Sequence, residues 1–565
     1  MASAAVQVFR LDVEAPFDRL TEKEKRYAHH MDRGCLAWNL NHSATGISRE
    51  DIRGFFTYAA TFLSNIGNYF GSGDQKFVPA VDASVLQKLA ARSTRLSELC
   101  EGIASAIYAI PPFSLGTLEH NSIFPENTRI RKAGDGTDFD VAIASVESDD
   151  LPQTLPHLGA EGALKLARGD HSSELEKICR ELSEAANYAA NDLQKEYLRA
   201  SIESFRTGSL DTYRESLRIW VRDKGPTAEH ILGFVEPYRD PHGIRSRFEG
   251  VVAIANPEET ELLATLVENS AMFIRRLPWA TAENDGRGPF EKSLFEPPDF
   301  SSIHTLAYCS SIIFPGINLH NYNDIRQEDG FKSVIIANRM VAEGRAIQYP
   351  FIEPELAETF QRHKFPAYYM WVVLHELFGH GTGKMMVEAE EGKHNFDINN
   401  PPINPVTENP IACWYRPGQT WTGQFGDRAT TVDECRAELV GAYLMDDLEL
   451  LKSFGFTESS DIRADDLTYN LYQQLGVDGL RGLANFNVDS GLAVTIQKWG
   501  QAHSRAHFAI FKCLLNDGDG VMAITHNIQL QTLTVRVDRS KISTHGKSAL
   551  GKMLLRLHII GARPT

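Results

Sequence analysis

The segment HELFGH, His375–His380, is the feature that most constrains this 565-residue chain. It follows directly on PAYYMWVVL (366–374), an apolar run typical of a buried helix. Neutral imidazoles and carboxylates are ligands that Zn²⁺ takes in proteins, and catalytic zinc sites keep a further position for water. The segment is therefore a candidate metal site.

The spacing of the two histidines sets a condition on the helix. In an HExxH helix the histidines lie four residues apart on one face, but His375 and His380 lie five apart. At 3.6 residues per turn, a regular helix would place them roughly 140° from each other. Both reach one metal only if the helix holds an extra residue as a π-bulge, and Gly379 is the position we expect for it. Glu376, beside the first histidine, is then placed to act as a general base on water.

The alternative is that these are two ordinary histidines in a buried helix. A single buried histidine is commonly structural. A His-Glu pair with a second histidine one and a half turns later is much less common in that role, so the pattern favours a metal.

A third ligand is expected from TTVDECRAELVGAYL (430–444), which contains three carboxylates: Asp433, Glu434 and Glu438. Thr431 with Glu434 reads as a capping box, but Thr430 with Asp433 can do the same and leave Glu434 free. Glu434 and Glu438 lie four apart and share a helix face. One carboxylate could bind the metal while the others orient the imidazoles.

HELFGH together with DECRAE (433–438) resembles the paired HExxGH and EECRAE motifs of the dipeptidyl peptidase III family, the M49 metallopeptidases. The resemblance implies one Zn²⁺ per chain, held by His375, His380 and Glu434. It implies Glu376 as the catalytic base. It also implies that Asp433, where the family usually has Glu, and Glu438 hold the ligand histidines.

Four further segments resemble the family: 67–79, 233–250, 314–332 and 499–508. The resemblance implies that Glu229 and Asn321 bind the free α-amine of a short peptide substrate, and that Gly316 and Asn318 meet the peptide backbone. His503 would stabilise charge at the scissile bond.

Two of the expected site residues, His503 and Arg326, also have structural interpretations. Taken alone, His503 and His507 are simply four apart on a helix, where they could be structural or a second metal pair. Arg326 is expected in the substrate cleft, but an interlobe salt bridge is an equal alternative.

The expected fold class is α+β, a two-lobed metallopeptidase with a cleft between the lobes. The resemblance implies a mixed lower lobe around a β-barrel and a mostly helical, zinc-bearing upper lobe. The expected ranges are 1–249 for the lower lobe, 250–301 for the upper lobe, 302–346 for a crossing segment with strands and cleft residues, and 347–565 for the helical catalytic lobe.

The sequence pattern gives coarse local expectations. Thr21 with Glu24 predicts a capping box opening a helix, and the first part, to about Tyr213, reads mostly helical. Residues 116–157 read as irregular structure. The runs 248–256 and 332–338 read as strands.

Composition narrows the function classes. The net charge of -17 disfavours nucleic acid and anionic membranes as partners. No apolar run reaches the length of a membrane span, and the N-terminus lacks a secretory pattern. The seven cysteines are scattered and odd in number, which favours reduced thiols and a cytoplasmic setting.

Three departures from the family pattern stand out. Ile231 replaces a polar residue, often Tyr, that is thought to hydrogen-bond the substrate carbonyl. The chain reads as truncated at its C-terminus relative to the family. A Kelch-type regulator is not expected, because residues 404–409 read NPVTEN in place of an acidic turn.

The leading hypothesis is a zinc exopeptidase that releases dipeptides from the N-termini of short peptides. A catalytically weak zinc-binding member that captures peptides or proteins is the alternative from another class. An aminopeptidase that removes single residues is a near neighbour.

Overall fold

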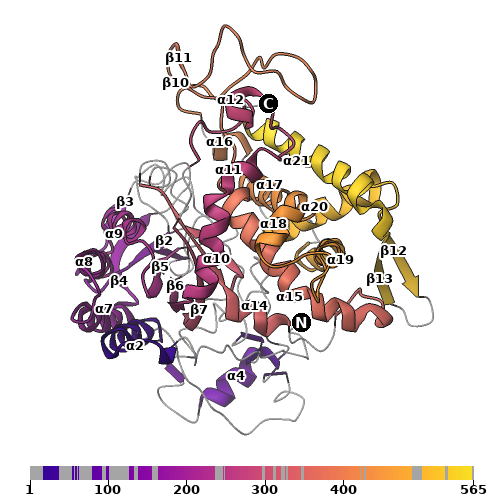
Figure 1. Ribbon diagram of the computed structural model, residues 1–565. Coiled ribbons are helices and arrows are strands. Elements are labelled where there is room, and N and C mark those ends of the chain that lie inside the picture. The colour runs from indigo at the N-terminus through magenta and orange to yellow at the C-terminus, as the bar shows by residue number, and fades with distance from the viewer. Residues whose placement is uncertain are drawn as a thin grey trace. The chain divides into compact units, whose positions relative to one another are not determined.

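The computed structural model describes most of the chain (Figure 1). The described residues are 17–36, 54–62, 79–91, 97–100, 126–132, 138–155, 163–235, 246–295, 299–309, 313–319, 325, 329–344, 349–486, 499–527 and 532–562, apart from 56, 60, 80, 99, 247, 420, 426–427 and 500. The chain forms two compact units. Unit 1 comprises residues 1–255, 304–313 and 320–330, and unit 2 comprises 256–303, 314–319 and 331–565.

Unit 1 combines helices with a four-stranded sheet. Its helices are α2 Glu22–Leu36, α4 Ala83–Ala90, α7 Ser172–Ala186, α8 Asp192–Thr207 and α9 Leu210–Arg222. Its sheet has the order β1-β2-β4-β3 and consists of β1 Thr128–Lys132, β2 Phe139–Ala144, β3 Gln153–Leu155 and β4 Leu164–Asp170. Strand β4 runs parallel to β2 and antiparallel to β3.

The sheet corrects the expectation of irregular structure over 116–157. Three of its strands lie in that range, and each is only three to six residues long. They bury a small apolar cluster of Ile130, Val141, Leu155 and Leu164. Strands this short between polar turns leave little periodic signal in a sequence, because pairing and packing decide them.

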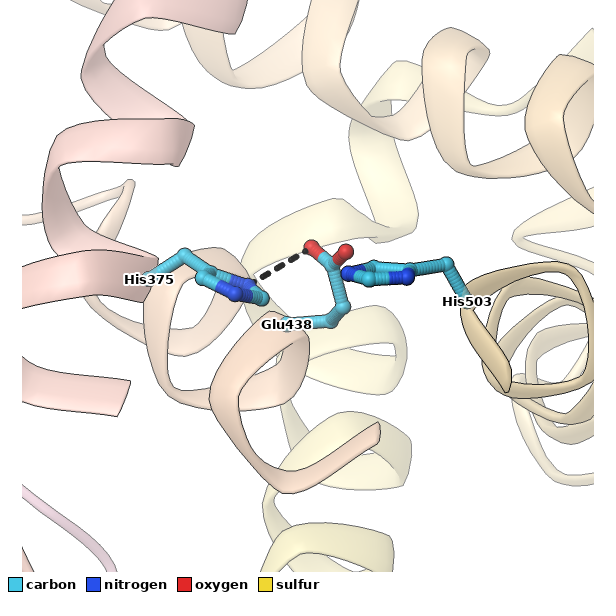
Figure 2. Close-up of side chains that lie close together, drawn as sticks. All are labelled: His375, Glu438 and His503. Carbon is cyan, nitrogen blue, oxygen red and sulfur yellow. Dashed lines mark ion pairs between the residues drawn. The ribbon is translucent and has the colours of Figure 1, made fainter. Parts of the chain in front are cut away.

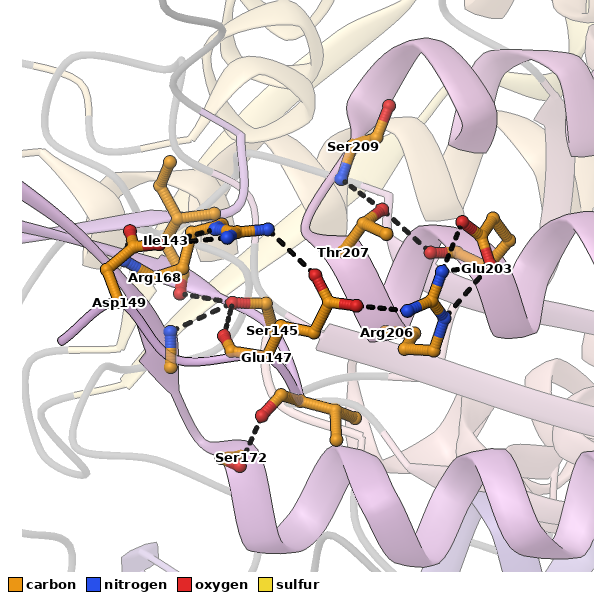
Figure 3. Close-up of polar contacts among 12 residues, drawn as sticks. Ile143, Ser145, Glu147, Asp149, Arg168, Ser172, Glu203, Arg206, Thr207 and Ser209 are labelled. Atoms are coloured by element: carbon orange, nitrogen blue, oxygen red, sulfur yellow. Dashed lines mark hydrogen bonds and ion pairs between the residues drawn. The ribbon is translucent and has the colours of Figure 1, made fainter.

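A polar network ties this sheet to α8 (Figure 3). Glu147 accepts hydrogen bonds from Arg168, at 2.9 Å, and from Arg206, which also pairs with Glu203. Arg168 donates in addition to Asp149. The side chains of Glu147, Arg168 and Arg206 are 37–47% exposed, so solvent screens their ion pairs and the network adds little to stability.

A second sheet has the order β5-β6-β7-β9-β8. Its strands are β5 Ala228–Phe234, β6 Phe248–Ala255, β7 Asp299–Cys309, β8 Gly316–Leu319 and β9 Lys332–Ile336. The strands expected at 248–256 and 332–338 are present, except that residues 337–338 already open α14, Ala337–Gly344. Strand β8 pairs antiparallel with β9 and ends the order, so among the described strands it lies at an edge of this sheet.

Unit 2 is dominated by helices. Its longer ones are α10 Pro257–Glu268, α15 Ala357–Leu374, α17 Ala429–Leu444, α19 Ala464–Gly482, α20 Ala502–Asp517 and α21 Lys547–Ala562. Shorter elements are α11 Ser270–Ile274, α12 Glu283–Gly286, α16 Trp421–Phe425, α18 Leu448–Ser453, the two-stranded sheets β10 Glu388–Glu390 with β11 Lys393–His394 and β12 Met522–Asn527 with β13 Thr532–Val537, and single turns of 3-10 or π type at 354–356, 375–379, 483–485, 539–541 and 542–546.

The core of unit 2 surrounds α17. This helix packs against α15, α20 and α21, and α19 packs against both α15 and α20. One large apolar cluster runs through these helices, with Leu374, Leu439, Leu471, Leu514 and Leu554 fully buried. Helices covered on several sides by other helices hold their side chains in place, which suits a site that needs fixed geometry.

Other local expectations are met as well. Thr21 and Glu24 form the capping box, with each backbone N–H bonded to the other side chain at 2.8 and 3.3 Å. No helix in the described part of the chain is long and apolar enough to cross a membrane. The mixture of helices and sheets confirms the α+β class, and the residue ranges of the expected lobes stay a prediction.

Candidate metal centre

Helix α15 ends in a single π-turn, η2, at His375–Gly379. The backbone N–H of His380 donates to the carbonyl of His375 over 3.1 Å, five residues back. The extra residue that the His spacing requires is therefore present, and the prediction of a bulge is confirmed.

Close packing explains the glycine in this turn. A Cβ added at Gly379 would lie 2.6 Å from Cα and 2.7 Å from Cβ of Ala437 on α17. A Cβ at Gly441 on the same helix would lie 2.8 Å from the Trp371 ring of α15. The two glycines let α17 approach the end of α15 closely enough for their side chains to meet.

Three side chains converge at this contact: His375, His380 and Glu434. Their ligand atoms all lie within 4.8 Å of one another. The Nε2 atoms of His375 and His380 are 3.1 Å apart. Glu434 Oε2 lies 3.4 Å from His375 Nε2 and 3.6 Å from His380 Nε2.

These residues fit a bound cation. Glu434 Oε2 is buried and receives no hydrogen bond of normal geometry from the described residues. The two Nε2 atoms face each other across a distance that only one hydrogen bond could bridge. Lone pairs left this way in a buried site are costly unless something positive binds there. Two imidazoles and a carboxylate are a donor set of catalytic zinc sites.

The Nδ1 atoms of the two histidines, on the far side of each ring from Nε2, lie next to carboxylates. His375 Nδ1 lies 3.3 Å from Glu438 Oε2, and His380 Nδ1 lies 3.3 Å from Asp433 Oδ2. Glu438 has a second partner, because its Oε1 lies 2.9 Å from His507 Nε2. Carboxylates in these positions fix the ring orientation of metal-binding histidines.

The electrostatics of the cluster favour positive charge. Burial alone would lower the pKa of both histidines, but the neighbouring carboxylates outweigh it. The pKa of His375 therefore lies well above its usual value, and that of His380 is raised to about 9. Burial would raise the pKa of Glu434, yet His503 and His380 hold it well below its usual range.

Glu376 lies within the π-turn and is buried. Burial raises its pKa above the usual value, although His375 and His380 oppose the shift. Its Oε2 accepts no hydrogen bond from any described residue. Gly316 of β8 leaves it room, since a Cβ there would lie 2.7 Å from Glu376 Oε1.

His503 approaches the cluster from α20. Its Nε2 lies 3.1 Å from Glu434 Oε2, and its Nδ1 lies 2.8 Å from the side-chain amide of Gln501. Figure 2 shows the Glu438 carboxylate between the rings of His375 and His503. These three residues form a second group whose ligand atoms lie within 4.8 Å of one another.

The capping boxes expected at the start of α17 are wrong. The helix begins at Ala429 with Arg428 as N-cap, and no side chain of the described residues donates or accepts a capping hydrogen bond there. Thr430 and Thr431 therefore lie inside the first turn. Glu434 is released from a capping role by this earlier start and points at the two histidines instead.

The expected substrate residues lie in different parts of the chain. Glu229 of β5 is buried, and its Oε1 accepts hydrogen bonds from Trp220 Nε1 at 2.9 Å and from the backbone of His230 at 3.0 Å. Asn318 of β8 donates to Ser333 Oγ at 2.8 Å. Ile231 is buried in β5. Asn321 and Arg326 lie outside the described residues.

Sequence reasoning missed three neighbours of the expected site residues. His507 holds Glu438, Trp220 holds Glu229, and Arg436 donates to the carbonyl of Gly379. The contacts of His507 and Arg436 appear only in the folded structure, since 69 and 57 residues separate these side chains from their partners.

The cluster of two histidines and a glutamate beside the buried Glu376 is the arrangement of a metal-dependent hydrolase centre. The sequence matches Peptidase family M49 over residues 114–563. The chain belongs to this family, and membership implies a metal.

Relatives of known name agree with this assignment. The chain is 33% identical to dipeptidyl peptidase 3 of Homo sapiens and 32% identical to that of Mus musculus, covering 98% of this chain and 84% of each relative. The dipeptidyl peptidase 3 of Dictyostelium discoideum is 32% identical over 99% of this chain and 86% of its own.

Solved structures share the fold. Dipeptidyl-peptidase III from Corallococcus sp. strain EGB superposes with a TM-score of 0.58 at 18% identity, covering 99% of this chain and 88% of that one. DPP III from Caldithrix abyssi gives 0.57 at 16% identity, with coverage of 96% and 88%.

Proposed function

We propose that this chain is a zinc-dependent exopeptidase that releases dipeptides from the N-termini of short peptides. The observation that carries the proposal is the buried Glu376 carboxylate, which directly follows His375 of the His375, His380 and Glu434 cluster and whose Oε2 accepts no hydrogen bond from the described residues. The relatives named dipeptidyl peptidase 3 support the choice of product.

In the proposed site His375, His380 and Glu434 hold one Zn²⁺ per chain. When bound, the ion acts as a Lewis acid and makes water a better nucleophile. Asp433 and Glu438 keep the two imidazoles turned toward it. With a cation bound in place of the proton on Nε2, the same contacts keep the remaining ring proton on Nδ1, so that Nε2 would face the ion.

Glu376 moves the protons. Its raised pKa suits a group that takes a proton from the attacking water and then returns it to the leaving amine. His503, next to Glu434, donates a hydrogen bond to the charge that develops at the cleaved carbonyl.

Strand β8 positions the peptide. It lies at the edge of its sheet, and Gly316 brings its backbone against Glu376. A peptide pairing with this edge would pass the base without meeting a side chain at that point. The resemblance adds Asn318 to this contact, Glu229 and Asn321 as partners of the α-amine, and Arg326 as a further substrate contact.

One observation favours a second candidate, a catalytically weak member that binds peptides. Ile231 lacks the hydroxyl that a Tyr would offer the substrate carbonyl, and losing one such donor costs about 10²–10³ in rate. Hydrolysis of dipeptidyl-naphthylamides by zinc-loaded protein separates the two candidates, because only the enzyme turns over.

Product analysis tests the exopeptidase assignment. Free peptides should yield dipeptides, and N-acetylated copies of the same peptides should be poor substrates. Equal cleavage of free and blocked peptides would remove the assignment and leave an endopeptidase, and release of single residues would make the protein an aminopeptidase.

A further inference from the structure

A π-turn departs from the regular hydrogen bonding of an α-helix. It widens the backbone and occurs mostly where function fixes it. In η2 the carbonyl of Gly379, the residue before His380, accepts a hydrogen bond from Arg436 Nη2. This donor comes from α17, the helix that also supplies Glu434.

Arg436 has a second contact that leads to the same histidine. Its Nη2 lies 3.7 Å from Asp433 Oδ1, and the other oxygen of Asp433 lies 3.3 Å from His380 Nδ1. The guanidinium therefore touches both the peptide that precedes His380 and the carboxylate that faces its ring.

The setting of Arg436 is unfavourable for a residue that serves packing alone. The side chain is buried, with 7% of the residue exposed, and Nη1 finds no hydrogen-bond partner among the described residues. A buried charge with incomplete pairing is usually no more stable than an apolar side chain of the same size. A role beyond stability is therefore indicated.

We propose that Arg436 is a positioning residue for His380. Its hydrogen bond to the Gly379 carbonyl stabilises the π-turn, and its ion pair with Asp433 fixes the orientation of the His380 ring. The Nε2 atoms of His380 and His375 then face the same point. The inference rests on the proposed zinc site.

The direction in which zinc affinity changes when Arg436 is replaced separates a positioning role from a purely electrostatic one. Arg436 carries a positive charge close to a cation site, so removing that charge alone would strengthen zinc binding. Removing a positioning residue weakens it, by about 10- to 100-fold for outer partners of metal ligands.

The experiment measures zinc retention by the whole chain in competition with a chelator of known affinity. Arg436→Met removes the guanidinium group and keeps a side chain of similar length. Arg436→Lys keeps the positive charge but lacks the planar guanidinium. Arg276→Met is the matched control, because Arg276 bridges Asp447 and Glu449 away from the zinc ligands. Melting of the zinc-free proteins is the second readout.

We expect Arg436→Met to bind zinc 10- to 100-fold more weakly than the parent and Arg436→Lys to be weakened as well. Arg276→Met should retain zinc like the parent, even if its melting temperature falls. Parental or tighter retention in Arg436→Met would overturn the inference. If Arg436→Met does not fold, parental retention in Arg436→Lys would overturn it. A parent that holds no zinc would refute the proposed zinc site instead.

Discussion

The Nε2 atoms of His375 and His380 face each other 3.1 Å apart, although five residues separate the two histidines. A regular helix would turn these side chains away from each other, and the π-turn brings them back. The metal-binding geometry therefore depends on one extra residue in α15 and on whatever keeps it there.

Gly379→Ala tests this dependence. The added Cβ would lie 2.6 Å from Ala437 Cα and 2.9 Å from its carbonyl oxygen, which are backbone atoms that cannot rotate away. We expect a loss of about 1–3 kcal/mol of stability and less than one zinc per chain, measured by thermal melting and elemental analysis.

The double variant Gly379→Ala with Ala437→Gly sharpens the test. It removes the side-chain contact at 2.7 Å but leaves the backbone contacts, so it should remain destabilised. Full recovery would show that the helices can separate and that their close approach is not what fixes the turn.

Glu438→Gln probes the orientation of His375. The carboxylate lies 3.3 Å from His375 Nδ1 and 2.9 Å from His507 Nε2, and an amide cannot accept from both with the same strength. We expect zinc affinity to fall about 10- to 100-fold in a chelator titration. Glu449→Gln, at an exposed ion pair with Arg276, should bind zinc as the parent does.

His558 predicts an acid sensitivity of the zinc-free fold. Its ring stacks on Trp279 with centroids 3.6 Å apart, and burial lowers its pKa to about 3. The folded state therefore resists a proton that the unfolded chain takes up near pH 6.5. The stability that neutral His558 contributes is complete above pH 6.5 and is lost as pH falls toward 3.

Between pH 7 and pH 5 this loss amounts to about 2 kcal/mol. The His558→Gln variant should be less stable at pH 7 but should lose less on going to pH 5 than the parent does. Thermal melting of both zinc-free proteins at the two pH values measures the difference. Equal losses would mean that His558 is protonated in the folded protein.

Local sequence was enough to predict the π-turn and the carboxylates that face its two histidines. The five-residue spacing required an extra residue, and Gly379 lies in the turn that contains it. The carboxylates of DECRAE lie opposite the histidines, as the motif pair indicated.

What sequence could not supply depends on distant partners. Helix α17 starts at Ala429, before both threonines, so both Thr-based boxes were wrong. Strands β1, β2 and β3 are too short to show a period and form because β4 pairs with two of them. The contacts of Arg436 and His507 join helices far apart in the chain.

Zinc content measured beside turnover is the most direct test of the proposed centre. The parent should hold one zinc per chain, the stoichiometry of a single three-ligand site. Glu376→Gln should keep that zinc and lose about 10²–10⁴ in rate on a dipeptidyl-naphthylamide. Glu434→Ala should lose most of its zinc. A full complement of zinc in Glu434→Ala, or a parent without zinc, would contradict the assignment of this cluster as the catalytic metal site.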